Sequence, residues 1–271
     1  MAEPTRRFTQ VLAALVIDRV GRARVQEALR SLDEPRFCER APELIDAAAD
    51  PAVRGVLAEP FDRDGCSVLP ALRSLRRDYP TLPVVVYGVI RPGAWGEIVR
   101  LHGIGIHDFV IRDHDDHPSA FRTVLDRAIA RSTAEYVIRE AGEWIPGDAR
   151  PVIELCLERP ARALTVAELS RLLGAHRKTI VRRMRAAGLP APSRLVGWCR
   201  LLHAARMLED PGRTLEAIAL HLDFASASAL RNMLSRYTGL SPTAVRERGG
   251  LACVLPLFLR ALAHGNGVKN T

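Results

Sequence analysis

The sequence predicts two domains of different classes. An α/β domain with a five-stranded parallel sheet is expected over residues 1–142, and an all-α domain with two helix-turn-helix motifs over residues 151–248, after a linker at 143–150. Three observations support this: strand-like and helical segments alternate in the first half, a motif is repeated in the second half, and the charge is divided unevenly. Residues 249–271 are interpreted as an apolar C-terminal extension and a tail.

In the first half, apolar runs of strand length alternate with segments of helical periodicity. Strands are expected at 10–17, 36–38, 54–58, 83–87 and 108–111. Helices are expected at 21–32, 42–49, 68–78, 94–102 and 119–131. Five strand–helix units in sequence predict a parallel sheet with helices on both faces.

The two halves differ in charge. Residues 1–150 hold 21 Lys or Arg against 23 Asp or Glu, a net charge of −2, whereas residues 151–271 hold 18 against 8, a net charge of +10. We therefore expect a polyanionic partner to bind the C-terminal half. The five cysteines form no CxxC pair, so a metal or disulfide framework is not expected, and we predict reduced thiols. No signal peptide or apolar run of about 18 residues is found, which favours a cytoplasmic protein without membrane contact.

A ten-residue motif occurs twice in the basic half, as Thr165–Gly174 and Thr214–Asp223. Each copy opens on a threonine suited to capping a helix, followed by apolar residues three and four apart. A turn and a second amphipathic helix follow each copy, at 177–187 and 226–237. This is the pattern of a helix-turn-helix, and it favours double-stranded DNA over RNA or membrane as the polyanion.

The second helix of each motif is the candidate DNA-recognition helix. In the first, Ile180 and Met184 are expected to face the core. The opposite side then carries the first set of candidate DNA-binding residues: Arg177, Lys178, Val181, Arg182 and Arg185. In the second, Leu230 and Leu234 are expected inside. The second set is Ala227, Ser228, Arg231 and Asn232.

The second half resembles the AraC/XylS family of transcription regulators. The resemblance is carried by Ile218–Phe224 with the serines after it, and by the closing run Gly239–Arg246. It implies two recognition helices in successive major grooves, roughly 34 Å apart. By position, it implies base contacts from Lys178, Val181, Arg182 and the second set. It also implies phosphate contacts from Arg183, Arg185, Arg194 and Arg236.

This sequence departs from the family pattern at three positions. Asp223 stands where a glycine is usual, His176 where a capping serine is common, and Leu234 where an aromatic residue is usual. The carboxylate of Asp223 is expected to weaken DNA docking of the second motif. We therefore expect the first motif to supply most of the affinity.

The first half resembles the receiver domain of response regulators, a flavodoxin-like fold. The residues that a phosphorylated receiver needs are largely replaced: Glu59 follows the third strand in place of Asp, Arg112 stands near the lysine position, and Asp18 is the only acid that ends the first strand. We therefore expect a domain that is not phosphorylated and that serves dimerisation, partner binding or ligand sensing.

The expected function is sequence-specific DNA-binding transcription regulation, without a cofactor, metal ion or catalytic residue. Expected partners are DNA, a second copy of the chain through the N-terminal domain, and RNA polymerase. Two alternatives stay open: phosphorylation control through Glu59 or Asp62, and a protein-binding adaptor whose DNA docking is impaired. An enzyme is disfavoured, because no nucleophile–base pair, phosphate loop or spaced carboxylate pair is found.

Overall fold

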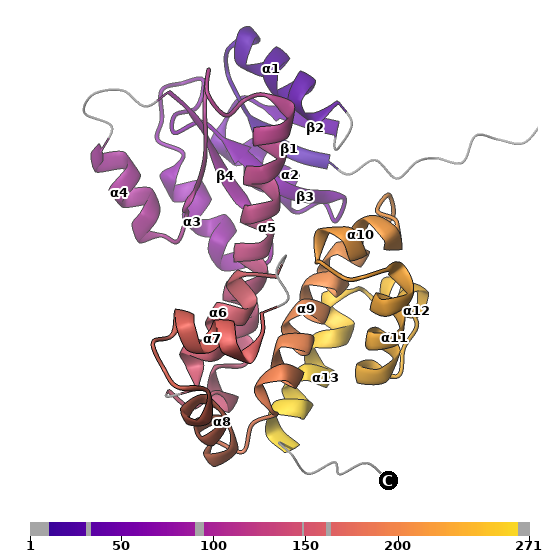
Figure 1. Cartoon of the computed structure of the whole chain (residues 1–271). Helices are drawn as coiled ribbons and strands as arrows, with labels where there is room; N and C mark the ends of the chain where they lie inside the picture. The colour runs from indigo at the N-terminus through magenta and orange to yellow at the C-terminus, as the bar shows by residue number, and fades with distance from the viewer. Residues whose placement is uncertain (1–10, 31–33, 90–94, 148, 161–163, 265–271) are drawn as a thin grey trace, which may run out of the picture. The chain divides into compact units, whose positions relative to one another are not determined.

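The computed structural model of the chain describes residues 11–30, 34–89, 95–147, 149–160 and 164–264. The chain divides into two compact units, Met1–Ser132 and Thr133–Thr271 (Figure 1). Parts of the expected elements, namely residues 10, 31–32 and 94, and most of the expected tail, 265–271, lie outside the described residues.

The first unit contains the five-stranded parallel sheet that the sequence predicts. Its strands are β1 (Val11–Leu15), β2 (Glu34–Cys38), β3 (Val53–Ala58), β4 (Val84–Gly88) and β5 (Asp108–Ile111). They pair in parallel in the order β2-β1-β3-β4-β5. This is the strand order of the flavodoxin-like fold, and it confirms the predicted fold class.

Helices cover both faces of this sheet. They are α1 (Arg19–Leu29), α2 (Ala41–Ala48), α3 (Leu69–Asp78), α4 (Trp95–Gly103) and α5 (Pro118–Glu140). Successive side chains of a strand point to opposite faces, so Leu12 and Ala14 of β1 pack with α1 and α5, whereas Ala13 and Leu15 pack with α2, α3 and α4. Because the strands are parallel, the carboxyl ends of β1, β3, β4 and β5 lie at one edge, where a doubly wound sheet binds its ligands.

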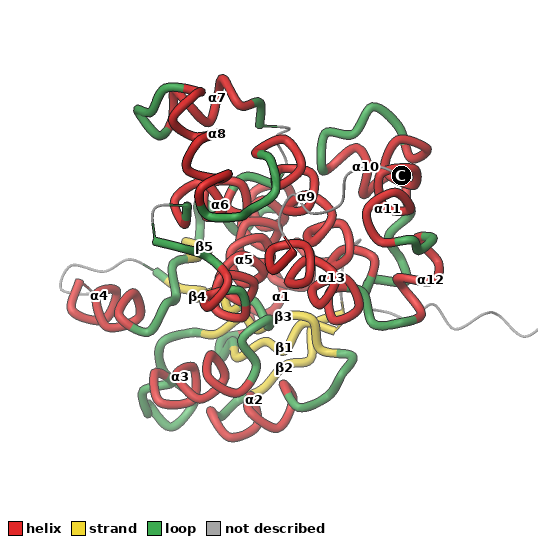
Figure 2. Tube along the Cα trace, turned by 90° about the horizontal axis from the view of Figure 1, so that it is seen from below, coloured by secondary structure: helices red, strands yellow, loops and turns green. Residues whose placement is uncertain are grey.

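The second unit is helical. Its elements are a short 3-10 helix η1 (Gly142–Trp144), α6 (Arg150–Glu158), α7 (Val166–Leu172), α8 (Arg177–Ala186), α9 (Pro192–Leu208), α10 (Leu215–His221), α11 (Ala227–Thr238), α12 (Pro242–Glu247) and α13 (Leu251–His264). Within this unit, α9 is central and almost wholly buried, with α7 and α8 on one side and α10 to α12 on the other (Figures 1 and 2).

The division between the units falls earlier than the expected end of the first domain at residue 142. The reason is that α5 continues past Ser132, and its apolar residues Ala134 and Val137 are buried in the core of the second unit. Two residues of the expected linker, 143–150, also belong to that core, because Ile145 is 5% exposed and Ala149 is fully buried. The Pro–Gly pair inside it marks a turn between packed segments.

The C-terminal extension is part of the second unit. Its helix α13 packs along α9, and the Phe258 ring lies 5.9 Å from that of Trp198. The carboxylate of Glu209, at the end of α9, accepts a hydrogen bond of 3.0 Å from the backbone N–H of Leu251. The apolar residues of the extension therefore complete the core of this unit. Among the described residues, no helix combines the length and apolarity needed to cross a bilayer.

Candidate nucleic-acid interface

The repeated sequence forms two helix-turn-helix motifs, α7–α8 and α10–α11. As the sequence predicts, Thr165 and Thr214 cap the first helices: their Oγ1 atoms accept hydrogen bonds of 3.1 Å from the backbone N–H groups of Glu168 and Ala217. In the α7–α8 motif, the carboxylate of Glu168 in turn accepts a hydrogen bond of 3.0 Å from the Thr165 N–H. This completes a capping box. The α10–α11 motif lacks one because the side chain of Ala217 has no acceptor.

The two turns place equivalent residues in the left-handed region. Gly174 has φ of 58° and Asp223 has φ of 56°. Glycine adopts this conformation without strain, and Asp is one of the few other residues that tolerate it. Asp223 therefore fills a glycine position at a small cost. The second turn is also longer, since residues 222–226 separate α10 from α11 but only 173–176 separate α7 from α8.

A buried arginine holds the second turn. Arg200, in the middle of α9, is 9% exposed. Its Nη2 donates to the carbonyl oxygens of Leu222 at 2.7 Å and Asp223 at 2.8 Å, and its guanidinium lies 3.8 Å from the centre of the Phe224 ring. Burial lowers the pKa of this guanidinium. The role of Arg200 was not predicted; the available signal was an arginine in the middle of the apolar run Trp198–Leu202.

Helix α8 presents the first predicted set of residues to solvent. Ile180 and Met184 are buried on its inner side, as predicted. His176, in place of the usual serine, caps the helix because its Nδ1 accepts from the Lys178 N–H at 3.2 Å. Val181 is 37% exposed between the charged residues. The exposed cations of α8 are Arg177, Lys178, Arg182, Arg183 and Arg185.

Helix α11 has a less charged outer side. Leu230 and Leu234 are fully buried, as predicted, and Ser226 caps the helix by accepting from the Ala229 N–H at 3.1 Å. The outer side exposes Ser228, Arg231 and Asn232, whereas Ala227 is only partly exposed. Of the second predicted set, Ala227 is therefore the least accessible.

Arg194 of α9 and Arg236 of α11 meet at one aromatic ring. Their guanidinium carbons lie 5.7 Å and 5.4 Å from the centre of the Tyr237 ring, within cation–π range. The ring stacks edge-on against Trp198 at 5.2 Å and reaches α9 at Gly197, where a Cβ would lie 2.5 Å from the Tyr237 hydroxyl oxygen. Both guanidinium groups remain exposed beside α11.

The cations of α8 differ in their partners from several arginines of the first unit. In the first unit, Asp108 receives both Arg127 and Arg131, and Asp18 receives Arg112. By contrast, no carboxylate of the described residues pairs with any exposed cation of α8, and α8 itself contains no acid. The positive charge of α8 is therefore free to act on a partner.

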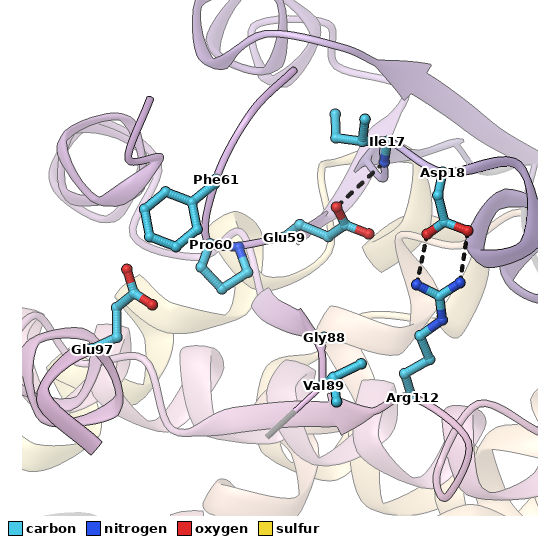
Figure 3. A pocket seen from close by; sticks show the side chains of 9 residues that line it. All are labelled: Ile17, Asp18, Glu59, Pro60, Phe61, Gly88, Val89, Glu97 and Arg112. Carbon is cyan, nitrogen blue, oxygen red and sulfur yellow. Dashed lines mark hydrogen bonds and ion pairs between the residues drawn. The ribbon is translucent and has the colours of Figure 1, made fainter. Parts of the chain in front are cut away.

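A second candidate site lies at the carboxyl edge of the sheet (Figure 3). Arg112 forms a bidentate pair with Asp18, with both N–O distances 2.6 Å, and this lowers the pKa of the Asp18 carboxyl. Glu59 accepts a long hydrogen bond of 3.4 Å from the Ile17 N–H, and burial raises its pKa. Asp62, the other proposed phosphoacceptor, does not line this pocket, and instead its Oδ1 accepts from the N–H of Cys66 at 2.9 Å. The described residues contain no group of three or more metal-ligating side chains.

Comparison with known proteins identifies the helical unit. Residues 169–248 match a family model described as a helix-turn-helix domain. A Streptomyces lividans protein described as an AraC-like transcription regulator is 34% identical over 108 residues, which cover 38% of this chain and 36% of that protein. The HTH-type transcriptional regulator VirS of Mycobacterium tuberculosis is 29% identical over 143 residues, or 51% of this chain and 41% of VirS. The matched parts thus span less than half the length of these relatives.

For the first unit, the N-terminal signal receiver domain of a response regulator from Bacteroides fragilis is structurally similar, with a TM-score of 0.38, 20% identity, and coverage of 44% of this chain and 95% of that domain. The strand order described above is that of the receiver fold. The chain therefore carries an AraC-type helix-turn-helix domain at its C-terminal end, together with an α/β unit of flavodoxin-like topology.

Proposed function

We propose that the chain is a sequence-specific DNA-binding transcription regulator, in which α8 and α11 enter successive major grooves. The observation that carries this proposal is the exposed face of α8, where five cations have no carboxylate partner among the described residues. A duplex supplies the missing negative charge, and binding releases the counterions condensed on it. The relatives whose sequences match this unit are described as transcription regulators, which supports the same function.

Within α8, the residues take two roles in this proposal. Lys178, Val181 and Arg182 read base edges, since Lys or Arg can donate to guanine O6 and N7 and an apolar side chain can contact the thymine methyl. Arg183 and Arg185 contact phosphates, which fix the register of the protein without specifying sequence.

Helix α11 contributes specificity more than affinity. Arg231 can donate to guanine and Asn232 can pair with adenine N6 and N7, with Ser228 and Ala227 beside them. Arg194 and Arg236, held beside Tyr237, contact the backbone next to this helix. The carboxylate of Asp223 is exposed in the adjoining turn and repels phosphate, so α8 supplies most of the affinity.

The receiver-like unit, in our proposal, is not phosphorylated and joins two copies of the chain; RNA polymerase is a further proposed partner. Arg112 already neutralises Asp18, the acid at the end of β1 that would hold a divalent cation together with Glu59. A phosphorylation-controlled regulator is the second candidate, because Glu59 lies at the end of β3. Incubation with a small-molecule phosphodonor and intact-mass measurement decides between them: an unchanged mass supports the first proposal, and a gain of one phosphoryl group at Glu59 contradicts it.

The test of DNA binding starts with selection of bound fragments from a genomic library by the full chain. Affinity for the selected site is then measured across a salt series, where the logarithm of the binding constant should fall by about 0.9 per phosphate contact for each unit in log salt. Arg182→Ala should cost on the order of 1–3 kcal/mol of specific binding. Arg260→Ala, which removes an exposed arginine of α13, is the matched control. A flat salt response, or equal effects of the two variants, would contradict the proposal.

A further inference from the structure

The edge of the sheet holds a pocket of about 530 Å³ that the DNA-binding proposal does not use. It opens where β1, β3, β4 and β5 end, the edge at which doubly wound sheets bind ligands. Its volume falls within the range of roughly 300–1,000 Å³ that is typical of small-molecule sites. Its lining residues, which Figure 3 draws, are Ile17, Asp18, Glu59, Pro60, Phe61, Gly88, Val89, Glu97 and Arg112.

The charge of this pocket is negative. Three carboxylates and one guanidinium line it, and the guanidinium is already satisfied, because Arg112 donates from both terminal nitrogens to Asp18. An anionic ligand would have to compete with Asp18 for Arg112. The carboxylates of Glu59 and Glu97 are not matched in this way by any cation among the described residues.

Glu59 is the carboxylate with the most to gain from a ligand. It is partly buried, and among the described residues its only hydrogen bond is the 3.4 Å contact from the Ile17 N–H. A carboxylate can accept about four hydrogen bonds, so most of its capacity is unused. Burial without matching donors raises its pKa, and a bound cation would reverse that effect.

Apolar side chains also line the pocket. Phe61 and Val89 are 47% and 49% exposed, unusual for large apolar side chains, and Pro60 lies between Glu59 and Phe61. Figure 3 places Phe61 and Glu97 on the opposite side of the pocket from the Asp18–Arg112 pair. A ligand that fills the pocket therefore contacts both carboxylates and an exposed aromatic ring.

We propose that this pocket binds a small organic cation, an amine with an aromatic or branched apolar body, whose ammonium group donates to Glu59 while its body packs on Phe61 and Val89. The ion pair between Asp18 and Arg112 closes the site to anions. This binding site is separate from the DNA-binding proposal and is tested without DNA.

The test uses isothermal titration calorimetry on the full chain with three probes of similar size. Phenethylamine is cationic at neutral pH, phenethyl alcohol is neutral, and phenylacetate is anionic. We expect phenethylamine to bind in the millimolar range or tighter and the other two at least about tenfold more weakly. Phe61→Ala should weaken all binding, since it removes the ring on which the probe packs.

Glu59→Gln is the decisive variant because it keeps the shape of the side chain and removes only its charge. It should weaken phenethylamine binding about tenfold or more and leave phenethyl alcohol unchanged. Glu27→Gln, at an exposed residue of α1, is the matched control and should bind like the unmodified chain. Preferred binding of phenylacetate, no binding of any probe at millimolar concentration, or equal affinities of the Glu59→Gln variant and the control would each overturn the proposal. DNA binding, assayed on the same samples, reports separately on the regulator proposal.

Discussion

Replacement of Arg200 by methionine tests whether one buried guanidinium positions α11, the second of the two proposed recognition helices. Methionine retains most of the apolar volume but removes the Nη2 donor that serves the carbonyl oxygens of Leu222 and Asp223 at 2.7 Å and 2.8 Å. A hydrogen bond from a charged donor contributes about 1.5–3 kcal/mol. The cation–π contact with Phe224 adds up to about 2 kcal/mol. The buried charge costs part of this gain, as the lowered pKa of Arg200 indicates.

The net loss in the free energy of unfolding of the second unit should therefore be about 2–4 kcal/mol. Urea unfolding followed by circular dichroism measures this loss, and hydrogen exchange locates it in α10, α11 and the turn between them. Arg200→Lys keeps the positive charge but lacks the planar guanidinium, so its unfolding free energy should lie between those of the wild type and Arg200→Met. Arg260→Met, which removes an exposed arginine of the same unit, is the control.

A positioning role also predicts a specific effect on DNA. If α11 binds DNA as proposed, footprints of Arg200→Met should lose protection over the half of the site assigned to α11, while the half assigned to α8 stays protected. Unfolding energies equal for Arg200→Met and Arg260→Met within about 0.5 kcal/mol, or a full-length footprint of unchanged affinity, would refute this reasoning.

Three further changes give expected outcomes. Gly197→Ala should destabilise the second unit by about 1–3 kcal/mol in urea unfolding, because the new Cβ would lie 2.5 Å from the Tyr237 hydroxyl oxygen; no loss would show that the ring can move freely. Asp223→Gly should tighten DNA binding in anisotropy titrations at low salt, because it removes a carboxylate from the turn. Glycine also adopts the left-handed φ of 56° at this position without strain. Weaker binding would contradict the proposed docking. Glu59→Gln should stabilise the first unit at neutral pH, because burial disfavours the charged carboxylate and raises its pKa. Because the pKa of Glu59 is raised in the folded state, the wild-type chain loses stability as the pH rises from the ordinary pKa of 4.5 through the folded-state pKa. The difference in unfolding free energy between variant and wild type should therefore vanish in acid. A difference that does not depend on pH would contradict this.

Much of the helix-turn-helix region could be predicted because it depends on residues close together in the sequence. Thr165 and Thr214 cap their helices through hydrogen bonds to residues three positions on. Ile180 and Met184, four apart, share the inner side of α8 and thereby set its basic side outward. Strand and helix types in the first unit were likewise predictable from periodicity. The ends differ by a few residues, except that α5 runs to Glu140 where the sequence predicts an end at residue 131.

Other features depend on residues far apart in the sequence, and only the tertiary structure decides them. Asp18 and Arg112 are 94 residues apart, and their pairing requires that β1 and β5 end at the same edge of the sheet. Arg200 meets Leu222 and Asp223 only because α10 folds back along α9. The division of the chain after Ser132 has the same origin: one continuous helix, α5, contributes residues to two cores, and helical periodicity does not change where one core ends and the next begins. The sequence by itself thus determined the helices, their exposed charges and the candidate recognition surface. Burial and long-range packing decided the pocket, the hydrogen bonds of Arg200 to the second turn, and the boundary between the units.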